Sequence, residues 1–203
     1  RETMYDQVAQ PRWQRYWNTP PDNTRDSEYL GLVGEILGGG KTSRLYERLV
    51  YRERLADSVS AGQSPLEIAG LFTLSADVKQ GVPVARVEAA MREELQRFID
   101  KGPTQAELER AKIAIRAGFV RGLERIGGFG GKADVLASCE VYARDPGCYR
   151  QSLEWIAAAK PADLQRVARQ WLSQGDYTLE VLPQPPYSAT AADAVDRESG
   201  PPV

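Results

Sequence analysis

The sequence has 203 residues, of which 42% are hydrophobic and 27% charged, and its formal net charge is −2. This size and composition predict one large or two small globular domains with a sizeable buried core. The chain has no basic surplus, so no nucleic-acid partner is expected, and no apolar run approaches the length of a membrane span. It contains no histidine, which excludes catalytic triads, histidine acid–base chemistry and histidine-ligated zinc within it. We therefore expect no catalytic residue and no metal site in this chain.

The first half of the chain predicts one strand, two helices and two further strands. The predicted ranges, in chain order, are 8–18, 26–37, 42–53, 57–64 and 70–78. In the first strand, Trp13, Arg15 and Trp17 alternate onto one face. The two helices have apolar residues three or four positions apart, such as Leu45 and Leu49, and a run of glycines separates them.

The second half predicts mainly helices and one last strand. The expected helices cover 83–100, 104–126, a segment ending near Tyr142, 149–159 and 160–172, and the strand covers 176–183. Thr104 and Glu107 form a capping-box pattern at the start of the second of these helices. From Gln184 onward the chain is rich in proline, alanine and serine and has no apolar period. We therefore expect a folded domain over 1–183 and a disordered tail or linker over 184–203.

The order of these elements predicts the α+β fold class. Helices and strands do not alternate one by one, as they do in a doubly wound parallel sheet. The order fits a two-layer domain, in which an antiparallel or mixed sheet of about four strands packs against several helices.

The stretch GEILGGGKTSRLYERL, residues 34–49, contains GKT, the end of a Walker pattern. The first glycine of that pattern would have to stand at position 35, which is Glu35. A phosphate loop also needs a buried strand before it, whereas the preceding residues have helical spacing. We therefore interpret Gly38, Gly39 and Gly40 as a turn between two helices, and we expect no nucleotide binding.

The paired carboxylates Glu93–Glu94 and Glu107/Glu109 are a second candidate for chemistry. General acid–base catalysis needs such groups in a pocket that raises their pKa. These lie beside arginine and lysine on helix faces opposite the apolar stripes, so we interpret them as solvent-exposed. The stretch GGFGG, 127–131, follows a helix and is interpreted as a helix break.

Cys139 and Cys148 are separated by nine positions, which is not a C-x-x-C spacing and does not predict zinc. They are either two ordinary cysteines or a local disulfide, and a disulfide would imply an oxidising compartment. The first residues, RETMYDQVAQ, lack the pattern of a signal peptide and look like the interior of a longer gene product. The compartment is therefore left open.

Five segments of the chain are distinctive in sequence and in order: PRWQRYW, ILGGGKTSRLYERLVYRERLADSVSA, GLFTLSADV, PTQAELERAK and LEVLP. Together they resemble the second domain of a half-unit in the pitrilysin/insulinase family of zinc peptidases, from about Val8 to Pro183. ILGGG followed by SRLY is the most specific part. The family also includes the mitochondrial processing peptidases and the core proteins of respiratory complex III.

The resemblance implies a role within a larger enzyme. In this family two similar domains make a half, and two halves close around a peptide. The zinc motif, H-x-x-E-H with a distal glutamate, belongs to the first domain of the catalytic half. The expected function is a non-catalytic C-terminal domain that walls the peptide chamber and docks a partner half, with zinc in the upstream domain of the parent. The alternative is a catalytically inactive structural or assembly subunit.

The expected partners are the upstream domain, a second peptidase half and a peptide substrate, which an edge strand could bind by strand addition. Many family members hold the substrate with an arginine and a tyrosine seven residues apart, after the SRLY helix. In this sequence Val50 and Asp57 stand at those positions, so that role is not transferred. The missing pair favours a zinc-bearing half with H-x-x-E-H upstream of Arg1. Bacterial members often work outside the cytoplasm, which favours a periplasmic parent without fixing it.

Overall fold

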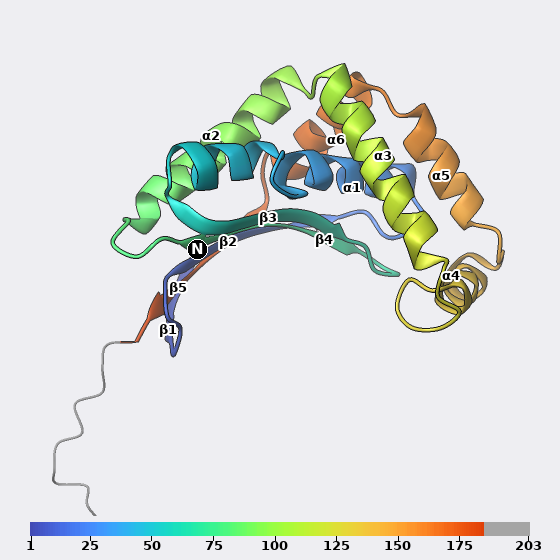
Figure 1. The fold of residues 1–203 in the computed structure, drawn as a ribbon, viewed down its shortest axis with the longest axis horizontal. Coiled ribbons are helices and arrows are strands. Elements are labelled where there is room, and N and C mark those ends of the chain that lie inside the picture. Colours follow the sequence, from blue (N-terminus) through green and yellow to red (C-terminus); the bar gives the residue numbers. More distant parts are fainter. Residues whose placement is uncertain (185–203) are drawn as a thin grey trace, which may run out of the picture.

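The computed structural model describes residues 1–184 as a five-stranded sheet with helices packed on one face. Figure 1 shows that the sheet is arched, that the helices lie on its convex side, and that its concave side is bare in the described part of the chain (Figure 1). The predicted α+β, two-layer fold is confirmed. The predicted tail lies outside the described residues, except for Gln184.

The sheet has the strand order β1-β5-β2-β4-β3. The strands are β1 (Glu2–Asp6), β2 (Arg12–Thr19), β3 (Ala56–Ser64), β4 (Gly70–Val78) and β5 (Asp176–Pro183). β1 runs parallel to β5, and the other neighbouring pairs are antiparallel. The first and last described strands therefore lie side by side at one edge, and β3 forms the other edge.

The sequence predicted about four strands, and the structure has five because β1 was missed. All side chains of β1 are exposed, so no alternation of buried and exposed residues marks it as a strand. Its backbone pairing with β5, from Glu2 opposite Leu179 to Asp6 opposite Pro183, holds it in the sheet.

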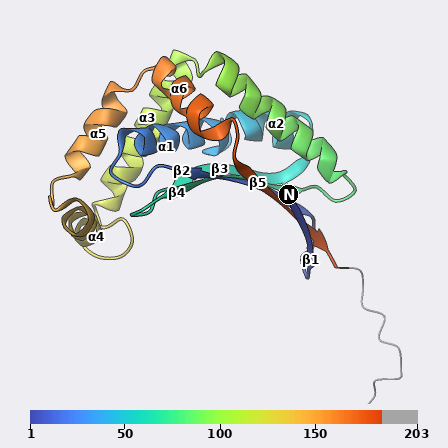
Figure 2. The ribbon, with the colours of Figure 1, turned by 180° about the vertical axis from the view of Figure 1, so that it is seen from behind.

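The helical layer is built from eight segments between β2 and β5. They are α1 (Arg25–Gly38), the π-helical η1 (Tyr46–Arg52), α2 (Val84–Lys101), α3 (Gln105–Gly122), α4 (Lys132–Ser138), the π-helical η2 (Cys139–Ala143), α5 (Tyr149–Ala158) and α6 (Pro161–Leu172). Figure 2 shows α6 and α2 on the helical side of the sheet, and both helices contact β2 (Figure 2). None of the helices within residues 1–184 is both long enough and apolar enough to cross a bilayer.

The core lies between the two layers. Trp13 and Trp17 of β2 are fully buried, as their alternation predicted, and the Trp17 ring meets Phe72 of β4 edge to face at 6.2 Å. Arg15 points inward between them, and its guanidinium lies 4.7 Å from the centroid of Trp17. Asp176 accepts two hydrogen bonds from Arg15, at 2.7 and 2.6 Å, so the buried charge is paired.

α3 ends at Gly122, earlier than the predicted end near 126. The chain then folds back on itself, and the Gly130 carbonyl lies only 2.6 Å from where a side chain on Gly122 would begin. This close approach needs glycine, and Gly128 and Gly130 also have positive φ. The expected helix over 104–126 is therefore too long at its end, where the reversal leaves Ile126 79% exposed.

Candidate functional site

The helices leave the concave face of the sheet open in the described part of the chain (Figure 1). Polar side chains predominate on β3 and β4, where Leu71 is an exception, and β2 and β5 add tyrosine, amide and aliphatic side chains. The outward residues include Glu2, Met4, Asp6, Arg12, Gln14, Tyr16, Asn18, Ser58, Ser60, Leu71, Thr73, Ser75, Asp77, Tyr177, Leu179 and Val181. We call this surface the open face. It offers hydroxyl, amide and carboxylate groups, so it differs in character from the apolar core beneath it.

Hydrogen bonds between neighbouring strands order the polar part of the open face. The Asp77 carboxylate accepts from Ser58 Oγ at 2.6 Å and from Arg12 Nε at 2.7 Å. The hydroxyls of Ser60 and Ser75 are 2.9 Å apart. Burial raises the pKa of Asp77, but the hydrogen bonds from Ser58 and Arg12 outweigh it, and the pKa lies below its usual value. Asp77 is therefore an ionised acceptor and does not suit general acid catalysis.

The apolar part of the open face is centred on two tyrosines. Tyr16 and Tyr177 stand opposite each other on β2 and β5, with ring centroids 6.3 Å apart. The Tyr177 hydroxyl donates to the Glu2 carboxylate of β1. This hydrogen bond is the main reason why the pKa of Tyr177 is raised. Tyr177 therefore stays neutral at physiological pH.

Two hollows lie along the open face. One, of about 500 Å³, has Tyr16, Asn18, Leu71, Tyr177 and Leu179 among its lining side chains. The other, of about 390 Å³, lies beside Arg12 and Asp77 and reaches the β1 edge. Both are open to solvent, as binding surfaces for an extended chain are.

β3, the edge strand on the other side, leaves one side of its backbone unpaired within the described residues. A β-bulge interrupts its pairing with β4 between Ala56 and Ser58, and Asp57 is the extra, exposed residue. The rest of the strand is regular from Ser58 to Ser64. An extended peptide could add to this edge.

The glycine run after α1 performs a packing role. A Cβ on Gly38 would collide with the backbone of Ala61 in β3, so glycine lets the end of α1 lie directly on the sheet. Gly40 has a φ of 107°, which a side chain would strain. The segment before the run is helix α1 and not a strand. Gly38 is the last residue of α1, and Gly39 and Gly40 lie between α1 and η1.

Arginines contact two of the carboxylates expected in solvent: Arg44 lies just before η1, Arg48 lies in η1, and Arg97 lies on α2. Glu94 is only 3% exposed, and its carboxylate accepts from Arg97 at 2.9 Å, with Arg48 Nη1 3.8 Å away. Glu107 accepts two hydrogen bonds from Arg44, at 2.7 and 2.8 Å. The interpretation of Glu94 and Glu107 as solvent-exposed is therefore wrong.

The neighbouring carboxylates Glu93 and Glu109 are exposed, as expected. The periodicity of α2 and α3 alone could not show the clamps on Glu94 and Glu107. Arg97 contacts Glu94 from three positions along α2, but Arg48 and Arg44 come from a segment far away in sequence, 63 positions in the case of Arg44 and Glu107. The hydrogen bond from Arg44 lowers the pKa of Glu107 to about 2, against the opposing effect of burial. Such a group is a structural anion and not an acid–base catalyst.

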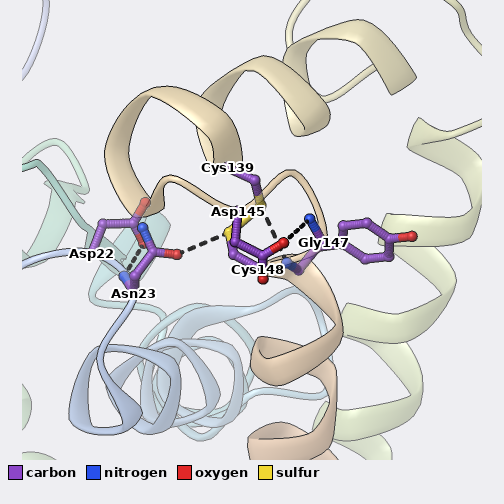
Figure 3. The surroundings of a disulfide bond; sticks show 7 residues. Asp22, Asn23, Cys139, Asp145, Gly147 and Cys148 are labelled. Carbon is purple, nitrogen blue, oxygen red and sulfur yellow. Dashed lines mark hydrogen bonds between the residues drawn. A yellow bond between two sulfur atoms is a disulfide. The ribbon is translucent and has the colours of Figure 1, made fainter.

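A disulfide joins Cys139 at the start of η2 to Cys148, just before α5 (Figure 3). The turn between them is held by the Asp145 carboxylate, which accepts from the Gly147 backbone N–H at 2.8 Å. The Tyr149 backbone N–H points at Cys139 Sγ, 3.2 Å away. Figure 3 also shows Asp22 and Asn23, from the segment before α1, beside the bond. The disulfide therefore lies where α1, η2 and α5 meet.

Comparison with known proteins decides the family. Residues 2–115, more than half of the chain, match the family described as "Peptidase M16 inactive domain". The chain belongs to this family. The resemblance to pitrilysin/insulinase peptidases is thus confirmed, since M16 is the same peptidase family.

Relatives of this M16 inactive domain are named as zinc proteases. It is 30% identical over 170 residues to zinc protease PqqE of Helicobacter pylori, a match that covers 82% of this chain and 36% of the relative. It is 29% identical over 145 residues to an uncharacterized zinc protease of Streptomyces coelicolor, covering 71% of this chain and 31% of the relative. The chain thus spans about a third of the length of these relatives.

Solved structures share the fold. A protease from Helicobacter pylori superposes with a TM-score of 0.78 at 22% identity, covering 90% of this chain and 43% of that one. An inactive peptidase domain from Bordetella parapertussis superposes with a TM-score of 0.76 at 20% identity, covering 92% of this chain and 99% of that one. The second structure therefore has nearly the same extent as this chain.

Val50 and Asp57, which the resemblance aligns with substrate-holding positions, lie in η1 and at the start of β3 of this M16 inactive domain. Val50, in η1, is half-buried and packs against the core. Asp57 is the exposed bulge residue of β3. An isopropyl group cannot donate the hydrogen bonds of an arginine, and a carboxylate would repel a developing negative charge. Nothing in this geometry supports transferring the substrate-holding role.

The zinc of the peptidase relatives has no matching ligand set in this M16 domain. The chain has no histidine, and both of its cysteines are in the disulfide. Within residues 1–184, no three aspartate, glutamate or cysteine side chains converge as a metal site would require. The described residues therefore do not fit zinc.

Proposed function

We propose that this chain is the non-catalytic C-terminal domain of a zinc-dependent metallopeptidase, that its open face forms part of the wall of the peptide chamber, and that it docks a partner half. The observation that carries the proposal is the open face itself. A sheet covered on one side only, concave on the other and lined by hydrogen-bonding side chains, is suited to face an extended peptide. Hydroxyls such as those of Ser60 and Ser75 donate and accept hydrogen bonds without imposing a charge.

The edge strand β3 supports the same proposal. Its outer backbone groups, from Ser58 to Ser64, could pair with an added peptide strand, and the side chains of the open face would lie next to that strand. The bulge at Asp57 ends the regular pairing and defines where such a strand would stop.

Catalysis would come from the rest of the parent protein. The chain covers about a third of zinc proteases to which it is similar, so such a parent has room for a separate zinc-bearing domain. We place an H-x-x-E-H motif and the zinc in the domain upstream of Arg1, with that domain and a second half as partners. The disulfide between Cys139 and Cys148 favours an oxidising compartment such as the periplasm.

The second candidate is a catalytically inactive structural or assembly subunit of the same family. Such a subunit would lack the upstream zinc motif that the first candidate requires. The two candidates differ only in the partner domain, so the parent must be tested.

The first experiment compares the chain with its full-length gene product. Both are assayed for bound zinc and for cleavage of an unstructured peptide, with and without chelator. We expect zinc and chelator-sensitive cleavage only in the longer protein. A full-length product without zinc would contradict the peptidase proposal and support the structural-subunit alternative.

The chamber wall is tested in the full-length protein with one substitution on each side of the sheet. Thr73→Arg places a bulky cation on the open face, whereas Ser173→Arg places it at an exposed position after α6. Thr73→Arg should raise KM or lower kcat/KM for peptide, and Ser173→Arg should not. Equal activity of the two variants would contradict the proposal that the open face forms part of the chamber wall.

A further inference from the structure

We infer that the hollow around Tyr16 and Tyr177 is a subsite for an aromatic side chain of an extended peptide that carries a basic residue nearby. This inference rests on the proposed function and deepens it by naming the class of substrate segment. We call this hollow, of about 500 Å³, the tyrosine subsite.

The floor of the tyrosine subsite is apolar and open. It extends across three neighbouring strands, with Leu71 on β4, Tyr16 on β2 and Tyr177 and Leu179 on β5. Leu71 is 40% and Tyr177 is 42% exposed, which is high for side chains of a sheet that packs a core. The two phenol rings stand 6.3 Å apart, so an entering ring could contact both at the usual distances of aromatic pairs.

Unused polar groups surround this floor. Among residues 1–184, the side chains of Gln14, Tyr16 and Asn18 take part in no hydrogen bond with protein. They are spaced two residues apart on one face of β2, which is also the side-chain spacing of an extended peptide. A peptide lying along β2 could therefore find backbone partners on both sides of the subsite.

The charge of the open face selects against acidic peptides. Four charged residues of β1, β2, β4 and β5 point to this face. Glu2, Asp6 and Asp77 are acidic, and Arg12 is basic. Arg12 is paired with Asp77, which leaves Glu2 and Asp6 as the uncompensated carboxylates. Glu2 already contacts the Tyr177 hydroxyl, so a basic residue next to the aromatic one would meet this carboxylate.

The test measures binding of short unstructured peptides to the chain by fluorescence anisotropy. The parent peptide carries one phenylalanine and one lysine beside it, and two companions replace the phenylalanine by serine or the lysine by glutamate. We expect the parent peptide to bind about tenfold more tightly than either companion. Tyr177→Ala should remove this preference, whereas Tyr177→Phe, which keeps the ring, should retain it. Tyr51→Ala, at an exposed tyrosine on η1, is the matched control and should bind as the unmodified chain does.

A second measurement does not depend on how well the variants fold. A peptide with a photoreactive benzophenone in place of the phenylalanine should cross-link to β2, the start of β4 or the start of β5. Binding without preference for phenylalanine, or cross-links on the helical layer, would overturn the subsite and leave the chamber-wall proposal intact. No binding by the chain and none by its full-length parent would overturn both.

Discussion

Arg44 holds Glu107 with two parallel hydrogen bonds and thereby ties the segment before η1 to the first turn of α3. Arg44 Nε and Nη2 donate to the two carboxylate oxygens at 2.7 and 2.8 Å, and Nη2 also donates to the Gly102 carbonyl at 3.1 Å. The guanidinium lies 5.1 Å from the centroid of Phe98. Glu107 also closes the capping box by accepting from the Thr104 backbone N–H at 2.7 Å. One carboxylate therefore serves both a helix cap and a long-range clamp.

This clamp predicts a specific acid sensitivity. The pKa of Glu107 is about 2 in the folded protein against an ordinary value of 4.5, so its contribution is present above pH 4.5 and is lost as the pH falls through about 2. The pair is partly screened by solvent, so we expect a contribution of about 1 to 2 kcal/mol to the free energy of unfolding. Arg44→Met should lose it at neutral pH in urea denaturation.

Glu107→Gln is the control for titration, because glutamine keeps the capping geometry and does not ionise. Between pH 5 and pH 2.5, unfolding free energy should fall less steeply in this variant than in the unmodified chain. Identical pH slopes for the two proteins would show that Glu107 does not titrate below its usual range.

The same clamp shows what the sequence can and cannot predict. The helices, four of the five strands and the inward faces of Trp13 and Trp17 follow from local periodicity, which the sequence displays directly. The burial of Glu94 and the pairing of Glu107 depend on arginines brought over α2 and α3 by the fold. No local pattern contains that information.

The candidate site was also only partly predictable from the sequence. Alternation on β2 and β4 predicts which side chains leave the core, such as Tyr16 and Thr73, but it cannot tell whether a second layer covers them. The pairing of Tyr16 with Tyr177 joins strands separated by most of the chain. The open face and its hollows could therefore not be predicted without the order of the strands in the sheet.

Arg54 has a strained backbone that a single substitution should relieve. It follows η1 with a φ of 53°, in the left-handed region that disfavours side chains, and its own side chain is exposed. Arg54→Gly should raise the free energy of unfolding by up to about 1 kcal/mol, after the extra flexibility of glycine in the unfolded state is subtracted. Arg54→Ala loses the same charge but keeps the strain, so it should give no such gain. Equal stability of the two variants in thermal unfolding would contradict the prediction that the backbone at Arg54 is strained.

Gly38 and Gly31 lie in the same helix and predict opposite responses to alanine. A methyl group on Gly38 would run into the Ala61 backbone of β3, which cannot move without disturbing the sheet. A methyl group on Gly31 meets nothing within 4 Å. Gly38→Ala should therefore destabilise the protein by about 1 to 3 kcal/mol. Gly31→Ala should be neutral or stabilise by up to about 1 kcal/mol, because alanine is the better helix former. Similar urea midpoints for both variants would show that the α1–β3 contact is looser than in the structure.

The bond between Cys139 and Cys148 predicts a redox-dependent stability. The folded protein, prepared without reductant, should show no free thiol on titration under denaturing conditions and two after reduction. The loop it closes has a sequence separation of 9, so reduction should lower the free energy of unfolding by about 2 to 3 kcal/mol in the chain-entropy description. A variant with both Cys139→Ser and Cys148→Ser should match the reduced protein and ignore reductant. Two free thiols in the oxidised preparation would contradict the disulfide. They would also contradict the structural argument for an oxidising compartment.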